Sequence, residues 1–234
     1  MSEKRLSVRF TRTDLLLWAG SAVLIFLSFL LFDRGSVLTL AASLTGVTSL
    51  IFNAKGHPFG QLLMVVFSVM YGVISWDAAY YGEMITYLGM SMPMAVFALV
   101  SWLRNPFEKG KSEVRVNRIG GREAVLLVLL TAGVTVGFYF ILEALHTANL
   151  LPSTLSVATS FLAAYLTFRR SAGYALAYAA NDRVLIVLWT LDARRDPASV
   201  SVIVCFVVFL ANDLYGYISW RRMRERQRRA SAAV

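Results

Sequence analysis

The sequence predicts an all-α integral membrane protein with eight transmembrane helices. Of its 234 residues, 57% are hydrophobic and only 16% are charged, and the mean hydropathy is +0.61. This composition is too apolar for a water-soluble surface. The apolar residues fall into eight runs of about 17 to 25 residues, the length that crosses a roughly 30 Å hydrocarbon core. The distribution of basic residues between the loops supports the same count.

The first apolar run follows a basic segment, as the core of a signal peptide does. It is longer than a typical cleavable signal core, so we interpret it as a retained span. In the fourth run, Pro93 is expected to kink the helix. The predicted spans are 14–32, 36–53, 59–76, 84–102, 124–145, 152–168, 173–189 and 199–220.

Lys and Arg in short loops are retained on the cytoplasmic side of a membrane. With a cytoplasmic N-terminus, nineteen basic residues fall in inner segments, three (Arg34, Arg194 and Arg195) fall in outer segments, and Arg183 lies inside a helix. We therefore expect a multi-pass protein of the cytoplasmic membrane with both termini inside. The basic tail 221–234 could bind nucleic acid, but arginines directly after a span favour a cytoplasmic anchor near anionic lipid. The inner basic residues are Lys4, Arg5, Arg9, Arg12, Lys55, Arg104, Lys109, Lys111, Arg115, Arg118, Arg122, Arg169, Arg170 and the six arginines after Trp220.

The chain is predicted to form a single membrane domain, 1–234, with an internal repeat. A shift of 113 residues aligns Trp76 with Trp189, and a shift of 118 aligns Trp102 with Trp220. The identities are few, but the topology supports a repeat, because spans two to four and six to eight form two triplets on either side of one helix. Transporters often contain such repeats. We expect an extra N-terminal helix (14–32), repeat 1 (36–102), a linker helix (124–145), repeat 2 (152–220) and the tail. A single linker helix makes the two three-helix repeats parallel.

Polar residues in the seventh span indicate a binding site, because Asp or Arg at the centre of a membrane helix costs about 2.5 to 3.5 kcal/mol. Residues three or four apart share a helix face, so the polar and aromatic groups of this span lie together. Matching positions occur in the third, fourth and eighth spans. The candidate substrate-binding residues are Tyr174, Tyr178, Asn181, Asp182 and Trp189; Gln61, Tyr71 and Trp76; Glu83 and Tyr87; and Asn212, Asp213 and Tyr215.

Such a lining suits a small, flat, hydroxylated solute, since amides and carboxylates bind hydroxyl groups and aromatic faces stack best on a cationic ring. Enzyme chemistry is not predicted. His57 and His146 lie in loops, and the sequence has no metal-ligand cluster, phosphate loop or nucleophile motif. We therefore expect no catalytic residue, cofactor or metal, and the lone Cys205 cannot form an intramolecular disulfide.

Several candidates also have a purely structural interpretation. Trp102 and Trp220, each near a basic residue at a cytoplasmic helix end, are expected to be interfacial aromatic anchors, and Trp76 and Trp189 could serve the same role at the outer side. Asn181 and Asn212 could join helices, and Glu83 could be a solvated acid at a helix start. Asp182 could pair with Arg183.

Three stretches carry a resemblance to a known family: NAKGHPFGQLLMVVFSVMYGVISW (53–76), YALAYAANDRVLIVLW (174–189) and FLANDLYGYISWRR (209–222). With the order of the loops, they resemble the PnuC family of bacterial vitamin transporters, in the form typical of Firmicutes, over about residues 36–222. The resemblance implies uptake of nicotinamide riboside across the inner membrane by facilitated diffusion, driven by phosphorylation inside the cell. It also implies a homotrimer and a fold similar to a full-length version of the SWEET sugar transporters, with a 3+1+3 arrangement.

Two positions depart from the pattern of many family members. Tyr174 and Ala177 stand where a W-x-x-W-x-x-x-N pattern has tryptophans before Asn181, and Tyr87 replaces a Gln four residues after Glu83. The substrate could therefore be another vitamin or nucleoside, such as thiamine, riboflavin or a deoxyribonucleoside. A non-transporting receptor or assembly subunit is the remaining alternative.

Overall fold

The computed structural model describes residues 10–108 and 110–232, and over these residues the fold is all-helical. Lys4, Arg5, Arg9 and Lys109, used above for topology, lie outside the described residues. The only extended pairings described are two isolated bridges in loops. The helices are α1 (Arg12–Phe32), α2 (Val37–Ala54), α3 (Phe59–Asp77), α4 (Tyr81–Ile85), η2 (Thr86–Ser91), α5 (Met92–Arg104), α6 (Gly121–Ala144), α7 (Leu150–Phe168), α8 (Tyr174–Asp192), η3 (Pro197–Ser199) and α9 (Val200–Ala232).

Among the described residues, seven helical segments are long and apolar enough to cross a membrane, with α4, η2 and α5 counted as one segment of 24 residues. The predicted integral membrane protein is thereby confirmed. Helix α8 is as long as its neighbours, with 19 residues, but it is not among the seven. Its sequence includes Asp182, Arg183 and Asp192, and these charges lower its mean hydropathy.

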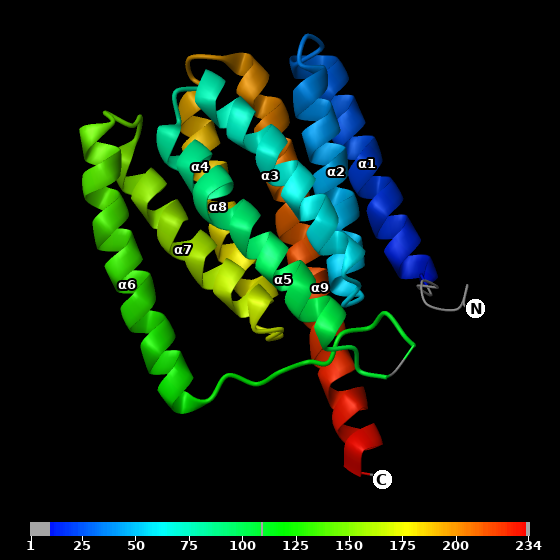
Figure 1. Ribbon diagram of the computed structural model, residues 1–234. Helices are drawn as coiled ribbons and strands as arrows, with labels where there is room; N and C mark the ends of the chain where they lie inside the picture. Colours follow the sequence, from blue (N-terminus) through cyan, green and yellow to red (C-terminus); the bar gives the residue numbers. More distant parts are fainter. Residues whose placement is uncertain (1–9, 109, 233–234) are drawn as a thin grey trace.

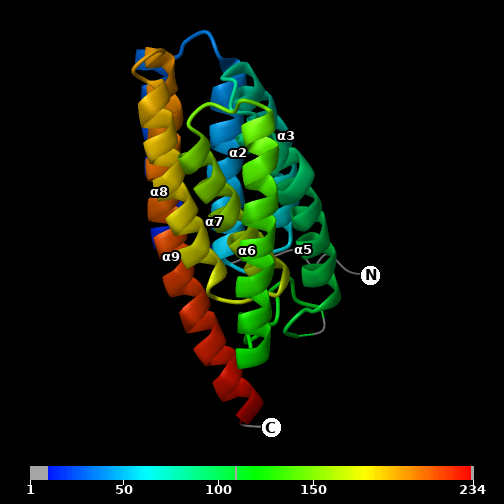
Figure 2. The ribbon, with the colours of Figure 1, turned by 90° about the vertical axis from the view of Figure 1, so that its left-hand side faces the viewer.

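The long helices run side by side, and the two ends of the described chain lie at the same end of the bundle (Figure 1). Helix α1 packs against α2 and α9 at one edge, and α6 packs against α7 and α4 at the other. Figure 2 shows α8 beside α9, with α6 at the surface of the bundle. Between these edges, α2 contacts α9 while α5 contacts α7.

Small buried residues allow these helices to approach closely, as in many membrane bundles. On α7 they recur at helical spacing at Ser153, Ser156, Ser160, Ala163 and Thr167, and all of these are buried. The hydroxyl groups do not lose hydrogen bonds in the apolar interior, because serine and threonine can donate to a carbonyl one turn earlier. Thr167, for example, donates to the Ala163 carbonyl at 2.8 Å.

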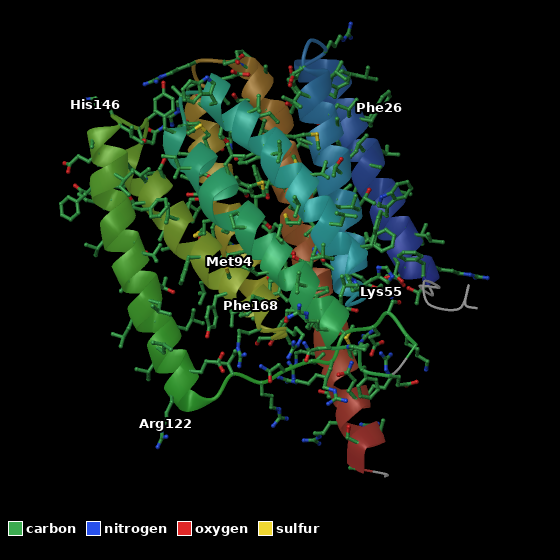
Figure 3. All side chains as sticks on the ribbon, viewed as in Figure 1. Phe26, Lys55, Met94, Arg122, His146 and Phe168 are labelled. Carbon is green, nitrogen blue, oxygen red and sulfur yellow. The ribbon has the colours of Figure 1, made fainter. Side chains whose placement is uncertain are left out.

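Basic side chains gather at the end of the bundle that carries Lys55 and Phe168, opposite the end that carries His146 (Figure 3). The described residues between α5 and α6, 105–108 and 110–120, cross this basic end (Figure 1). The Val114 amide donates to the Gly56 carbonyl at 3.0 Å, and the Asn117 amide donates to the Arg170 carbonyl at 2.9 Å. This segment therefore joins the turn after α2 to the turn after α7.

The interpretation of Trp102 and Trp220 as interfacial anchors is wrong. Their side chains are 1% and 0% exposed, and each indole N–H donates to a backbone carbonyl inside the protein. Trp189 is also buried, whereas Trp76 is 56% exposed, as expected for a residue that faces lipid or the interface. The sequence could not predict that Trp102 and Trp220 are buried, because a tryptophan at a helix end next to arginine occurs both at the membrane interface and inside a protein.

Candidate functional site

Three aromatic side chains from three segments meet in the core between the two halves of the bundle. Tyr71 on α3 and Trp189 on α8 are joined by a hydrogen bond, in which the indole N–H donates to the Tyr71 hydroxyl at 2.6 Å. The ring of Tyr87, in η2, lies 4.4 Å from the Tyr71 ring between centroids. All three are buried. We call Tyr71, Tyr87 and Trp189 the aromatic cluster.

A buried carboxyl group lies beside this cluster. Glu83 is fully buried, and neither of its oxygens has a hydrogen-bond partner among the described residues. The Ser156 hydroxyl is close enough to Glu83 to interact with it, but its hydrogen bond in this structure is donated to the Asn181 carbonyl oxygen at 3.3 Å. Glu83 lies near both Tyr71 and Tyr87. A carboxyl group without any partner in the interior is costly, so Glu83 is a strong candidate for contact with a ligand.

A second acidic site lies between α8 and α9. Asp182 and Asp213 are 3% and 4% exposed, and their carboxyl groups interact with each other. One oxygen of Asp182 has no partner. The described structure contains no salt bridge to Glu83, Asp182 or Asp213. Arg183, next in sequence, is exposed on another face of α8, so the suggested pairing of Asp182 with Arg183 is not found.

Asn181 lies on the same face but uses its carbonyl oxygen within the second half of the bundle. That oxygen accepts hydrogen bonds from Thr159 at 2.7 Å, Ser160 at 3.0 Å and Ser156 at 3.3 Å, all on α7. Asn181 therefore joins α7 to α8, which was the structural alternative. Asn181 also precedes Asp182 in the chain, and its partner Ser156 lies near Glu83. It therefore still borders the acidic region.

The other predicted residues lie away from the aromatic cluster. Gln61 donates to Asn53 at 2.8 Å, between α3 and α2, and Tyr215 donates to Asp14 on α1. Asn212 donates to Ser21 on α1 at 2.9 Å. Trp76 is exposed beside Tyr81.

Tyr174 and Tyr178 lie between the acidic site and the basic end of the bundle. The Tyr174 ring is 6.1 Å from Tyr178 and 5.0 Å from Trp220. Both tyrosines lie near Asp213, and Tyr178 also lies near Asp182. Tyr178 thus borders the acidic site, while Tyr174 belongs to the cluster around Trp220.

Sequence reasoning missed several aromatic residues at the same place. Tyr80 is 1% exposed, its hydroxyl donates to the Leu188 carbonyl at 3.2 Å, and its ring is 5.2 Å from Trp189. Phe206 packs edge-on against Tyr71 at 5.4 Å. A signal was available for Phe206, because it precedes Asp213 by seven residues on α9 and so lies on the same helix face. Tyr80 stands just before α4, outside the helix, and helical spacing could not have found it.

A cavity of about 230 Å³ lies beside Tyr80 and is lined in part by Arg194 and Arg195. Tyr80 forms part of its wall and also separates it from Trp189. The amide of Asn149 donates to the Tyr80 hydroxyl at 3.1 Å and helps to fix the ring. The residues that line the cavity are Tyr80, Asn149, Leu191, Asp192, Arg194 and Arg195.

Residues 36–222 match the family model described as "Nicotinamide mononucleotide transporter". The chain belongs to this transporter family. The match confirms the family that the three sequence stretches indicated, and it extends from the start of α2 to Arg222 in α9. Among the described residues, no group of three or more potential metal ligands is found.

Two curated relatives of this transporter are named nicotinamide riboside transporter PnuC. The one from Neisseria mucosa is 26% identical over 225 residues, which cover 93% of this chain and 82% of the relative. The one from Haemophilus influenzae is 23% identical over 195 residues, which cover 82% of each. A solved structure, titled crystal structure of the vitamin B3 transporter PnuC, matches with a TM-score of 0.84 at 21% identity, covering 96% of this chain and 97% of that one. The transporter therefore shares the fold of that protein.

Proposed function

We propose that this transporter carries nicotinamide riboside into the cell and that the aromatic cluster with its buried carboxyl groups is the substrate site. The observation that carries the proposal is Glu83, fully buried beside Tyr71 and Tyr87 with no partner for either oxygen. Nicotinamide riboside contains a positively charged pyridinium ring. Tyrosine and tryptophan faces attract such a ring, and a carboxylate neutralises it.

The same charges favour the riboside over the mononucleotide. The phosphate of the mononucleotide would bring negative charge close to Glu83, Asp182 and Asp213. Within the described residues, these carboxyl groups have no cationic partner. Like charges in a weakly polar interior repel strongly, so a phosphorylated substrate would need a cation that this region does not supply. The names of both curated relatives support the riboside.

Thiamine is the second candidate that this geometry favours, because it also carries a positive ring. Riboflavin and deoxyribonucleosides lack that charge, so their binding would leave the negative charge of the Glu83 carboxylate without a positive charge beside it. A non-transporting receptor or assembly subunit fits least, since the whole region matches a transporter family. We regard the chain as a carrier that performs no covalent chemistry and needs no cofactor.

The architecture that we propose has eight spans, in a 3+1+3 arrangement with α1 added at the edge. The helix contacts support it, because α2 with α9 and α5 with α7 are equivalent pairs when α2, α3 and α5 are superimposed on α7, α8 and α9. Both termini lie in the cytoplasm in this arrangement. We further propose a homotrimer in the bacterial cytoplasmic membrane and transport by facilitated diffusion.

Uptake into liposomes tests the proposal. We expect saturable entry of labelled nicotinamide riboside, much slower entry of the mononucleotide, and internal riboside that reaches but does not exceed the external concentration. Protein-free liposomes provide the background. If thiamine or riboflavin enters and nicotinamide riboside does not, the proposed substrate is wrong. Accumulation that depends on an ion gradient would exclude facilitated diffusion.

A further inference from the structure

Two Ser-Trp pairs close the basic end of the bundle. On α5, Trp102 donates through its indole N–H to the Thr167 carbonyl at 3.0 Å, and Ser101 donates to the Phe168 carbonyl at 3.1 Å. These carbonyls lie in the last turn of α7. The first pair thus connects repeat 1 to repeat 2.

The second pair makes the equivalent contacts in the opposite direction. On α9, Trp220 donates to the Asn53 carbonyl and Ser219 donates to the Ala54 carbonyl, both at 2.7 Å. These carbonyls lie in the last turn of α2. The two indole rings meet with centroids 5.4 Å apart, and both side chains are buried. We call Ser101, Trp102, Ser219 and Trp220 the Ser-Trp clamp.

The clamp lies between the candidate substrate site and the basic end. Asp213 and Trp220 are seven residues apart on α9, which places them on one face about 10 Å apart. Tyr174 and Ala175 lie beside Gly216, between these two residues, and the Tyr174 ring is 5.0 Å from Trp220. The buried Ala98 belongs to the same apolar cluster and precedes Trp102 by one helical turn. The two indole rings therefore lie between Asp213 and the basic end of the bundle (Figure 3).

The bonds of the clamp are suited to repeated breaking. The Asn53 and Thr167 carbonyls also accept the backbone amides of Gly56 and Arg170, both at 2.9 Å, so they stay hydrogen-bonded when the indole donors leave. Carbonyls in the last turn of a helix lack the regular bond to an amide four residues on, and water can replace the serine donors when the halves separate. Segment 105–117 would limit that separation. It is bonded to the turns after α2 and α7, and its Val116 amide donates to the Gln227 side chain on α9 at 2.9 Å.

We propose that the Ser-Trp clamp is the inner gate of the transport path and that it is closed in this structure. The proposal rests on the proposed transport function. Opening of the gate breaks the four side-chain bonds and separates Trp102 from Trp220, which exposes Ala98 and the substrate site to the cytoplasm. Closure restores a symmetric set of contacts between the two halves.

The test uses a single reporter thiol behind the clamp. In a Cys205→Ser background, Ala98→Cys is labelled with a membrane-impermeant thiol reagent applied from the cytoplasmic side. Loss of a hydrogen bond shifts an equilibrium by roughly fivefold. We therefore expect the double variant Trp102→Phe/Trp220→Phe, which keeps an aromatic though smaller ring at each position and removes both N–H donors, to be labelled at least about fivefold faster. Ser101→Ala/Ser219→Ala should act in the same direction and provides a milder variant if the first folds poorly.

The matched control is Trp18→Phe. Trp18 also donates its indole N–H, to Thr48 on α2 at 3.1 Å, but it lies outside the clamp. Equal labelling rates in the clamp variants and the control would overturn the proposal. External nicotinamide riboside should change the labelling rate in the unmodified clamp. If it has no effect while the clamp variants are still labelled faster, the gate is supported and the substrate assignment fails.

Discussion

At the scale of single residues, the site is defined by buried polar groups that lack partners. Glu83 has none for either oxygen, and Asp182 lacks one for Oδ2, although both lie in a bundle in which most buried hydroxyls are hydrogen-bonded. The neighbouring Asn181 differs, because three α7 hydroxyls saturate its oxygen. We therefore assign charge recognition to the acids and helix packing to the amide.

Substitution Glu83→Gln removes the charge but keeps the shape. We expect affinity for nicotinamide riboside to fall about tenfold or more, equivalent to about 1.4 kcal/mol. The reduced riboside has an uncharged ring, and its affinity should change much less. Thermal stabilisation by each ligand measures both. The control is Glu143→Gln, which makes the same change at an exposed position near the C-terminal end of α6. Equal losses for the charged and the reduced ligand would argue against charge recognition by Glu83.

His57, in the turn between α2 and α3, provides a residue-level test of stability. Burial lowers its pKa below the usual 6.5, and its Nδ1 accepts the Phe59 amide at 3.2 Å while Nε2 has no partner. Because the unfolded chain has the higher histidine pKa, it binds the proton first as the pH falls, and the folded state loses stability below about pH 6.5.

We expect His57→Gln to reduce the fall in Tm between about pH 7.5 and about pH 5.5, the range in which histidine titrates. Differential scanning fluorimetry of the purified transporter measures this fall. His146→Gln changes an exposed histidine and should leave it as in the unmodified chain. If both variants behave alike, His57 is not the responsible group.

At the scale of the helices, two features set the geometry of the site. The predicted irregularity at Pro93 occurs as the π-helical segment η2 directly before α5, which begins at Met92. Proline lacks an N–H and widens the preceding turn, and such segments are frequent at functional sites. Tyr87 lies within η2 and Glu83 one turn earlier, so this irregular turn sets their relative direction.

The second feature is the close contact of α2 with α9 at Gly46. A Cβ there would lie 2.2 Å from Cζ of Phe209 and 3.1 Å from Cδ2 of Phe67, both buried. Gly46→Ala should therefore lower stability by about 1 to 3 kcal/mol, the usual cost of overpacking. Thermal unfolding in detergent measures it. At Gly133 on α6 an added Cβ meets nothing within 4 Å, so Gly133→Ala should be neutral or stabilising, and a similar loss in both variants would contradict this explanation.

At the scale of the whole molecule, the arrangement depends on whether α8 spans the membrane. Its Asn181 and Asp182 are buried in a helix that packs against α7 and α9, which explains how a helix of lower hydropathy can lie inside the bundle. If α8 spans, the chain crosses eight times and both termini lie on the cytoplasmic side. Seven spans would place the termini on opposite sides.

Thiol labelling of single-cysteine variants in intact cells decides between these topologies. In the Cys205→Ser background, Gly35→Cys lies between α1 and α2 and should react with an impermeant reagent added outside. Ala232→Cys at the end of α9 should react only after the cells are opened. Labelling of Ala232→Cys from outside would mean that α8 does not cross, and unmodified Cys205→Ser cells provide the background.

The sequence by itself determined the membrane class, the positions of the long helices and the family, and it named most of the acidic and aromatic residues of the site that we propose. These follow from local properties, namely apolar length, loop charge and the helical spacing of polar residues. Only the tertiary structure decided which candidates meet. It separated Trp76, Tyr215 and Gln61 from the aromatic cluster, added Tyr80, and buried Trp102 and Trp220. The physical reason is that a helix face seen in isolation does not reveal which partner helix covers it, and that partner is set by packing between residues more than 60 positions apart.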